Sequence, residues 1–167
     1  MPFPVMCLIL AFMAFVVIPV HGQSAEEPSS RANLFIAPLI EAIGYSRDTI
    51  AFGAGVAFGG GDGIALGTSI LYAMDSRNFH TLEFAVFMRV YLQGSQASTG
   101  PFVQLIAGAA AFEYKRVVSF RSGIGALSAG LAAGWRFPFK DQWYVEPSVR
   151  AGYPYRIGIG VSAGYRL

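Results

Sequence analysis

The sequence predicts an all-β fold: an eight-stranded antiparallel up-and-down transmembrane β-barrel preceded by a cleavable signal peptide. Three observations predict this fold. Hydrophobic residues make up 54% of the chain and charged residues only 13%, whereas soluble domains have roughly 25% charged residues. After residue 25, no segment has the ~18 consecutive apolar residues of a membrane-spanning helix. From residue 33 onward, residues of two kinds alternate with the period of two that is typical of β-strands.

The first 25 residues, MPFPVMCLILAFMAFVVIPVHGQSA, have the organisation of a secretory signal peptide. An apolar run is followed by the helix-breaking Pro19 and by a small polar stretch suited to cleavage. No Lys or Arg precedes the apolar run, so an uncleaved membrane anchor remains the alternative. The single cysteine, Cys7, lies inside this segment, so no disulfide or sulfur-ligated metal site is expected in the rest of the chain. Residues 26–32 are expected to form a short polar periplasmic segment, and residues 33–167 the barrel.

Eight segments of alternating residues, separated by polar or glycine-rich breaks, are expected to form the strands. They are residues 33–44, 49–60, 64–74, 80–93, 101–114, 125–137, 143–153 and 155–167. A strand of about 9–11 residues tilted near 45° spans a bilayer, and these segments have that length or slightly more. Eight is the smallest usual strand number of a transmembrane barrel, whose interior is then narrow enough to be filled by side chains.

In each of the first three segments, one set of alternate residues is apolar, and the other set contains small residues or a charged residue. The first, NLFIAPLIEAIG, carries Glu41 in this second set, and the next, TIAFGAGVAFGG, alternates Ile, Phe and Val with Gly and Ala. Asp62 and Gly63 then predict a tight hairpin, because both central residues of such a turn must tolerate positive φ. The third segment, IALGTSILYAM, continues the same alternation.

The remaining segments place charged residues opposite the apolar face. HTLEFAVFMRVYLQ has Glu83 and Arg89 there. In PFVQLIAGAAAFEY, continued alternation would put Glu113 on the apolar face, and a β-bulge would restore the register. GALSAGLAAGWRF opposes Leu, Trp and Phe to Ser and Gly, and WYVEPSVRAGY opposes an apolar face to Glu146 and Arg150. A proline makes a tight corner into YRIGIGVSAGYRL, in which glycines alternate with apolar residues.

The glycine-rich face is expected to point inward and the apolar face outward. Glycine weakens a strand unless something needs the room, and converging faces inside a narrow tube need it. Hydrocarbon cannot hydrogen-bond to the backbone, so only closure of the sheet satisfies every strand edge. Aromatic belts are expected at both membrane interfaces. The periplasmic belt is predicted to be Trp135, Phe137, Trp143 and Tyr165. The opposite belt is predicted to be Tyr45, Tyr72, Phe79, Tyr153 and Tyr155.

This pattern resembles the small eight-stranded outer-membrane barrels of Gram-negative bacteria, the OmpA/OmpX/OmpW-like group. The resemblance covers the chain after the signal peptide and is sharpest in WYVEPSVRAGYPYRIGIGVSAGYRL. It implies a monomer in the cell outer membrane, in contact with outer-membrane lipid and assembled by the barrel-assembly machinery through its last strand. The signal read by that machinery matches at Ile159, Val161, Ala163 and Tyr165, whereas Leu167 replaces the usual terminal phenylalanine.

Charged residues on the inner face are expected to form a network in the lumen. Its predicted members are Glu41, Glu83, Arg89, Glu146, Arg150 and Arg156. We expect Glu41 to pair with Arg156, because the first and last strands are neighbours in a closed barrel, and Glu146 to meet Arg89. Arg136 and Arg166 lie near the periplasmic rim, where solvent can reach them. Buried charges must be paired or hydrated, so the network either fills the lumen or lines a narrow wet path.

The expected function is that of an integral outer-membrane barrel with a structural or surface role and a mostly filled lumen. One alternative is a narrow channel for passive passage of small solutes or hydrophobic molecules. Another is a soluble periplasmic lipid-binding barrel, which would keep Ile157, Ile159 and Val161 inside and expose Glu146 and Arg150. The loops opposite the termini are short, and only residues 114–122, YKRVVSFRS, offer much surface, which is basic.

Other functions have little support in the sequence. A net charge of +2 without a basic cluster does not indicate nucleic-acid binding. We expect no enzymatic activity, because His80, with Asp75 and Ser76 nearby, is a weak signal for a lipid-modifying site. The glycine string before Asp62 has no following helix and is assigned to a turn rather than to a nucleotide site. No metal or cofactor is expected.

Overall fold

The computed structural model describes residues 34–45, 49–61, 63–76, 79–92, 99–116, 119–140 and 142–167. The predicted signal peptide, residues 1–25, and the predicted polar segment, residues 26–32, lie outside the described residues. Residues Ala32–Leu167 form one compact unit. No helix in the described part of the chain is long and apolar enough to cross a membrane.

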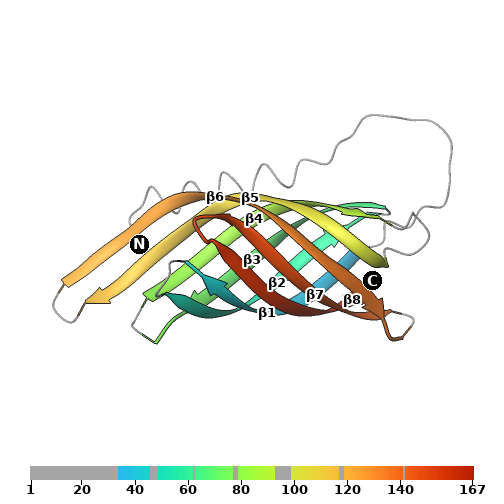
Figure 1. Ribbon diagram of the computed structural model, residues 1–167, viewed down its shortest axis with the longest axis horizontal. Helices are drawn as coiled ribbons and strands as arrows, with labels where there is room; N and C mark the ends of the chain where they lie inside the picture. Colours follow the sequence, from blue (N-terminus) through green and yellow to red (C-terminus); the bar gives the residue numbers. More distant parts are fainter. Residues whose placement is uncertain are drawn as a thin grey trace. The chain divides into compact units, whose positions relative to one another are not determined.

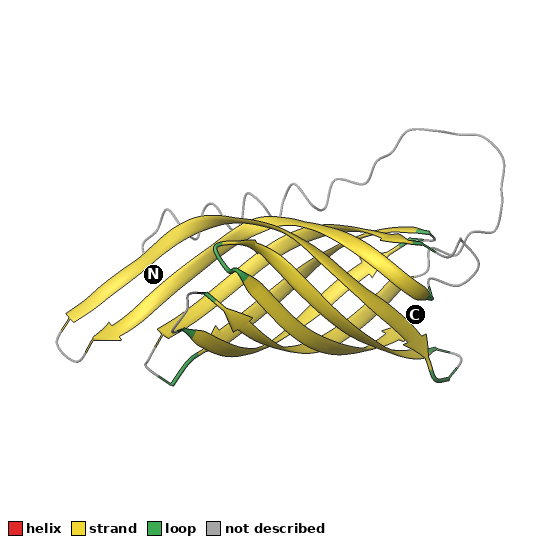
Figure 2. Ribbon diagram, in the orientation of Figure 1, coloured by secondary structure: helices red, strands yellow, loops and turns green. Residues whose placement is uncertain are grey.

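The described residues form eight strands and no helix, which confirms the predicted fold. The strands are β1 (Leu34–Gly44), β2 (Ile50–Gly60), β3 (Ile64–Met74), β4 (Phe79–Tyr91), β5 (Gly100–Arg116), β6 (Ser119–Pro138), β7 (Trp143–Tyr153) and β8 (Ile157–Arg166). Each strand pairs antiparallel with the next, and β1 pairs with β8, which closes the barrel (Figures 1 and 2). We call the end where β1 begins and β8 ends the terminal end, and the opposite end the hairpin end.

Strands β5 and β6 are longer than the sequence predicts and extend past the hairpin end. The segment expected as a basic loop, residues 114–122, is mostly strand, since pairing continues to Arg116 opposite Ser119. Strand β6 meets β7 only from Ala129 onward. The yellow and orange strands in Figure 1 therefore project as a two-stranded hairpin beyond the neighbouring wall.

The irregularity expected near Glu113 is present, but it lies on the other strand. Phe112 faces Ile124 and Tyr114 faces Arg121, so β6 has one more residue than β5 across this step. Strand β5 keeps its register with β4, where Glu113 lies opposite His80. Phe112 packs against a cluster inside the barrel, so Glu113 points to the outward face. The bulge does not bring Glu113 inside.

The apolar face points outward along the wall and the small or charged face points inward. Ile159 and Leu131 are 61% and 55% exposed, whereas Glu146 is buried. This arrangement is the reverse of that in a soluble barrel, which would place the apolar side chains in its core. The exposed face of the sheet is therefore suited to contact with hydrocarbon.

Glycines permit close approach between neighbouring strands and side chains on the inner face. A Cβ at Gly108 would lie 2.0 Å from the carbonyl oxygen of Phe84 on β4, which is backbone and cannot rotate away. At Gly164, a Cβ would overlap the ring of Tyr144, 2.0 Å from its Cζ atom. The absence of a side chain at Gly164 on β8 therefore leaves the space that the ring of Tyr144 on β7 occupies.

Apolar side chains gather in two clusters inside the barrel, one toward each end. Among the described residues, one inner cluster near the terminal end contains Phe35, Phe87, Tyr91, Phe102 and Tyr144. A second cluster near the hairpin end contains Ile43, Leu71, Phe79 and Tyr155, with Tyr45 and Phe112 packed against it. We call them the terminal cluster and the hairpin cluster. The charged side chains of the lumen lie next to these rings and between the two clusters.

Substitution of Gly108 tests the close approach of β4 and β5. We expect Gly108→Ala to lower the free energy of unfolding by roughly 1–3 kcal/mol, because the new Cβ forces the two backbones apart. The measurement is the urea midpoint of the barrel refolded in lipid vesicles. Gly125→Ala on β6 is the matched control, because nothing lies within 4 Å of its Cβ. Equal midpoints for the two variants would contradict the close approach.

Candidate functional site

Charged side chains in the lumen form the candidate site. Strand alternation turns them inward from four strands, because every second residue of a strand faces the same side. In the described part of the barrel they are Glu41 on β1, Glu83 and Arg89 on β4, Arg136 on β6, and Glu146 and Arg150 on β7. They assemble into two separate groups of three.

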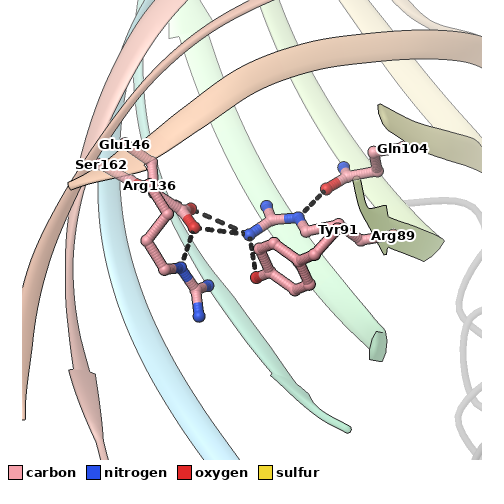
Figure 3. Close-up of polar contacts among 6 residues, drawn as sticks. All are labelled: Arg89, Tyr91, Gln104, Arg136, Glu146 and Ser162. Atoms are coloured by element: carbon pink, nitrogen blue, oxygen red, sulfur yellow. Dashed lines mark hydrogen bonds and ion pairs between the residues drawn. The ribbon is translucent and has the colours of Figure 1, made fainter. Parts of the chain in front are cut away.

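The group nearer the terminal end has two arginines on one glutamate, and we call it the cationic triad. Arg89 Nη1 donates to both carboxylate oxygens of Glu146, at 2.8 and 2.9 Å, and Arg136 Nε donates to Glu146 Oε1 (Figure 3). Ser162 Oγ donates to the other oxygen at 3.2 Å, and Gln104 Oε1 accepts from Arg89 Nε at 2.8 Å. Such charge-assisted hydrogen bonds are the stronger kind, and the low dielectric of the interior strengthens them further.

The terminal cluster surrounds the two guanidinium groups of the cationic triad. The Cζ atom of Arg89 lies 4.1 Å from the ring centroid of Phe102, and that of Arg136 lies 3.8 Å from the centroid of Tyr144. The negative faces of the rings attract the cations. The aromatic residues of this end therefore fill space and at the same time stabilise buried positive charge.

The group nearer the hairpin end has the opposite composition, and we call it the anionic triad. Arg150 Nε donates to Glu41 Oε1 at 2.5 Å, and Arg150 Nη1 donates to Glu83 Oε2 at 2.9 Å. The Cζ atom of Arg150 lies 4.0 Å from the ring centroid of Tyr155 in the hairpin cluster. One arginine thus bridges two carboxylates that come from β1 and β4.

A cavity of about 70 Å³ lies between the two triads. Arg89 and Glu146 line it from one side, and Glu41 and Arg150 from the other. The remaining polar lining comes from Gln104, Ser148 and Ser162. A polar cavity of this size can hold water.

The structure corrects the expected partner of Glu41. Glu41 meets Arg150, whereas Arg156 is exposed in the turn between β7 and β8. The prediction extended the alternation of β8 through this turn. The alternation stops there, since Tyr155 is buried while Arg156 and Ile157 are both exposed. The expected contact between Glu146 and Arg89 is present.

Arg136 belongs to the site, although the sequence reading placed it at a solvated rim. It is 1% exposed and bonds to Glu146. Alternation along β6 already turns it inward, in line with the buried Ser128. The sequence did not show how deeply the side chain of Arg136 is buried in the barrel, because this depends on how β6 and β7 align.

The predicted aromatic belts are only partly outward-facing. Tyr72, Tyr153, Trp135, Phe137 and Trp143 are exposed. Tyr165 is half-buried, with its ring centroid 5.0 Å from that of Trp143, and its hydroxyl donates to Gln142.

Three residues of the expected outer belt point inward instead. Phe79 and Tyr155 are 3% and 1% exposed in the hairpin cluster, and the rings of Tyr45 and Phe79 lie 5.0 Å apart. The prediction of these three as belt residues was therefore wrong. The sequence did indicate that Tyr45 and Phe79 face inward, because each lies an even number of residues from a predicted inward residue, Glu41 or Glu83.

The remaining predicted positions lie on the outward face or at the rim. Ile159, Val161, Ala163 and Leu167 on the last strand are exposed, and the backbone N–H of Leu167 donates to Leu34. His80 also faces outward, where its Nδ1 and the Tyr72 hydroxyl form a hydrogen bond of 2.6 Å. Asp75 accepts a hydrogen bond from the backbone of Phe79 and so stabilises the turn before β4.

Solved structures supply the comparison with known proteins. No protein family and no curated protein matches the sequence. Neisserial surface protein A matches 84% of this chain and 99% of its own, with TM-score 0.56 and 11% identity. The N-terminal β-barrel domain of Pseudomonas aeruginosa OprF matches 80% of this chain and 98% of its own, with TM-score 0.52 and 17% identity. Yersinia pestis outer membrane protein Ail, in a phospholipid bilayer nanodisc, matches 81% of this chain and 99% of its own, with TM-score 0.53 and 10% identity.

At these identities the similarity concerns the fold. All three are small barrels whose own length is almost fully covered, and the strand order here is a closed β1 to β8. The chain therefore has the fold of the small eight-stranded outer-membrane β-barrels.

Proposed function

We propose that the protein is an integral outer-membrane barrel with a structural or surface role and a filled lumen. The observation that carries the proposal is the arrangement of its two faces. Apolar side chains cover the outside, and every member of the two triads is paired within the barrel. A closed barrel with these faces satisfies its backbone hydrogen bonds in hydrocarbon and keeps its buried charges paired in the lumen.

The filled lumen favours a structural role over passive passage of solutes. The terminal and hairpin clusters pack inside the tube, against the guanidinium groups of the triads. A solute would have to displace aromatic side chains at both ends as well as paired charges. A soluble lipid carrier is disfavoured for a different reason, because Ile157 and Ile159 are exposed while Glu146 is buried.

The projection and the basic sequence of the β5–β6 hairpin support a role at the cell surface. We propose that the terminal end faces the periplasm and that the exposed aromatic residues of both rims contact outer-membrane lipid. The β5–β6 hairpin then projects outward, and its sequence is basic at Lys115, Arg116 and Arg121. We further propose that the protein is a monomer and that β8 presents the signal for the barrel-assembly machinery.

Membrane extraction and conductance test the proposal. We expect the protein to stay in the membrane pellet after alkaline carbonate washing, because hydrocarbon contact rather than surface charge retains it. Its mobility on a gel should shift on heating, as expected for a closed barrel. In planar bilayers the protein should produce no unitary current. Release into the supernatant would contradict membrane integration, and steady conductance would contradict the filled lumen.

The centre of the cationic triad is expected to be the most sensitive position for stability. Glu146→Gln removes the carboxylate that pairs with both Arg89 and Arg136, which leaves two buried cations facing each other. We expect a loss of about 3–5 kcal/mol in the free energy of unfolding, measured from urea midpoints in lipid vesicles. Glu113→Gln removes an outward-facing carboxylate and is the control. Similar midpoints for both variants would show that the triad does not stabilise the barrel.

Leu167 tests the proposed assembly signal. Leu167 stands where the resembling barrels usually end in phenylalanine. We expect Leu167→Phe to increase the heat-modifiable fraction in outer membranes of expressing cells, because the change improves recognition. Spontaneous folding into vesicles should stay the same, since Leu167 is exposed. An equal gain in both systems would indicate a stability effect, and no gain in cells would reject the assignment.

A further inference from the structure

Three buried hydrogen-bond donors toward the terminal end have no partner. Among the described residues, Arg136 Nη2, the Tyr144 hydroxyl and Arg166 Nε are all buried atoms without a hydrogen bond. Arg136 and Tyr144 are 1% and 0% exposed, whereas the side chain of Arg166 is half-buried. Leaving a buried polar atom unpaired costs free energy, and native proteins usually satisfy such atoms with water or an ion. These three donors, which come from β6, β7 and β8, therefore require an explanation.

The three donors lie against the same two aromatic rings. The Cζ atom of Arg136 lies 3.8 Å from the ring centroid of Tyr144 and 4.9 Å from that of Phe35. Arg166 is directly opposite Phe35 in the pairing of β1 with β8, so both side chains point inward. The Tyr144 hydroxyl lies over Gly164, two residues before Arg166, since a Cβ there would be 2.1 Å from it. The donors therefore gather at one corner of the terminal cluster.

This corner has an excess of positive charge. The inward-facing charged side chains toward the terminal end, among those described, are Arg89, Arg136, Arg166 and Glu146, hence three positive charges, one negative charge and a net charge of +2. The carboxylate of Glu146 already accepts hydrogen bonds from Arg89, Arg136 and Ser162. In Figure 3 the terminal nitrogens of Arg136 point away from this carboxylate. Because buried charges must be paired or hydrated, the corner is suited to a negatively charged group.

We propose that this corner is a binding site for a small inorganic oxyanion such as phosphate, held by Arg136, Tyr144 and Arg166. Guanidinium groups form their strongest hydrogen bonds with oxyanions. A tetrahedral oxyanion has oxygen atoms in several directions, which suits donors that come from three strands. The half-buried Arg166 gives access from the terminal end. Since all three donors face the lumen rather than the lipid-facing wall, the ligand is a free anion and not a lipid headgroup. The site goes beyond the proposed function and does not depend on it.

Equilibrium dialysis with radiolabelled phosphate tests the site on the folded barrel in maltoside micelles, which contain no phosphate. The unaltered protein should bind one phosphate per barrel. Tyr144→Phe keeps the ring and removes only the hydroxyl, so it should weaken binding roughly tenfold, and Arg166→Gln by at least as much. Arg156→Gln is the matched control, because it removes the same charge from an exposed turn at the hairpin end and should leave the affinity unchanged. Heat-modifiable mobility verifies that each variant is folded.

Competition identifies the bound group. Chloride at equal ionic strength and short-chain phosphatidylglycerol should not displace the phosphate, and displacement by the lipid at equal concentration would overturn the assignment to a free anion. If Arg166→Gln fails to assemble, Arg166→Lys keeps the charge but lacks the planar guanidinium group, and it should also bind more weakly. Absence of phosphate binding, an unchanged affinity in Tyr144→Phe, or an equal loss in Arg156→Gln and Arg166→Gln would each overturn the site.

Discussion

The proposed membrane placement puts one constraint on the structure, which is that strand backbones in hydrocarbon must find all their hydrogen bonds within the sheet. Pairing of β1 with β8 meets this constraint and leaves every described strand with a neighbour on both sides, except along the projecting β5–β6 hairpin. Closure with eight strands also makes the interior narrow. The apolar face must then be the outer one, and the inner face must be small wherever strands and rings approach closely, as at Gly108 and Gly164.

A narrow, closed interior determines how its charged residues behave. A buried charge is tolerated only when it is paired, and the six triad residues pair across β1, β4, β6 and β7. Aromatic rings from the terminal and hairpin clusters cover the same guanidinium groups. The aromatic packing and the pairing of the charges are therefore parts of one arrangement. The proposed surface role is assigned instead to the hairpin, which lies outside this packed interior.

Three irregular features near the hairpin end could not be predicted from local sequence patterns. The basic segment 114–122 reads as a loop because it interrupts the alternation, yet pairing between β5 and β6 continues through it. The bulge opposite Glu113 lies on β6 between Arg121 and Ile124, in a stretch that the sequence reading left between two predicted strands. The turn before β8 likewise reverses the faces, so that Tyr155 is buried and Arg156 is exposed. Irregularities of this kind depend on contacts between strands, which no single segment contains.

The sequence by itself determined the number of strands, their order, the direction of each face and most of the inward charges, because a period of two is a property of each strand alone. Tertiary structure decided which charges meet. Glu41 pairs with Arg150 rather than Arg156, and Arg136 lies buried on Glu146 rather than at a rim. Partner and depth depend on register and shear between strands that are distant in the chain. The alternation of residues predicts whether a side chain points inward or outward, whereas its contact partner is determined only by the closed barrel.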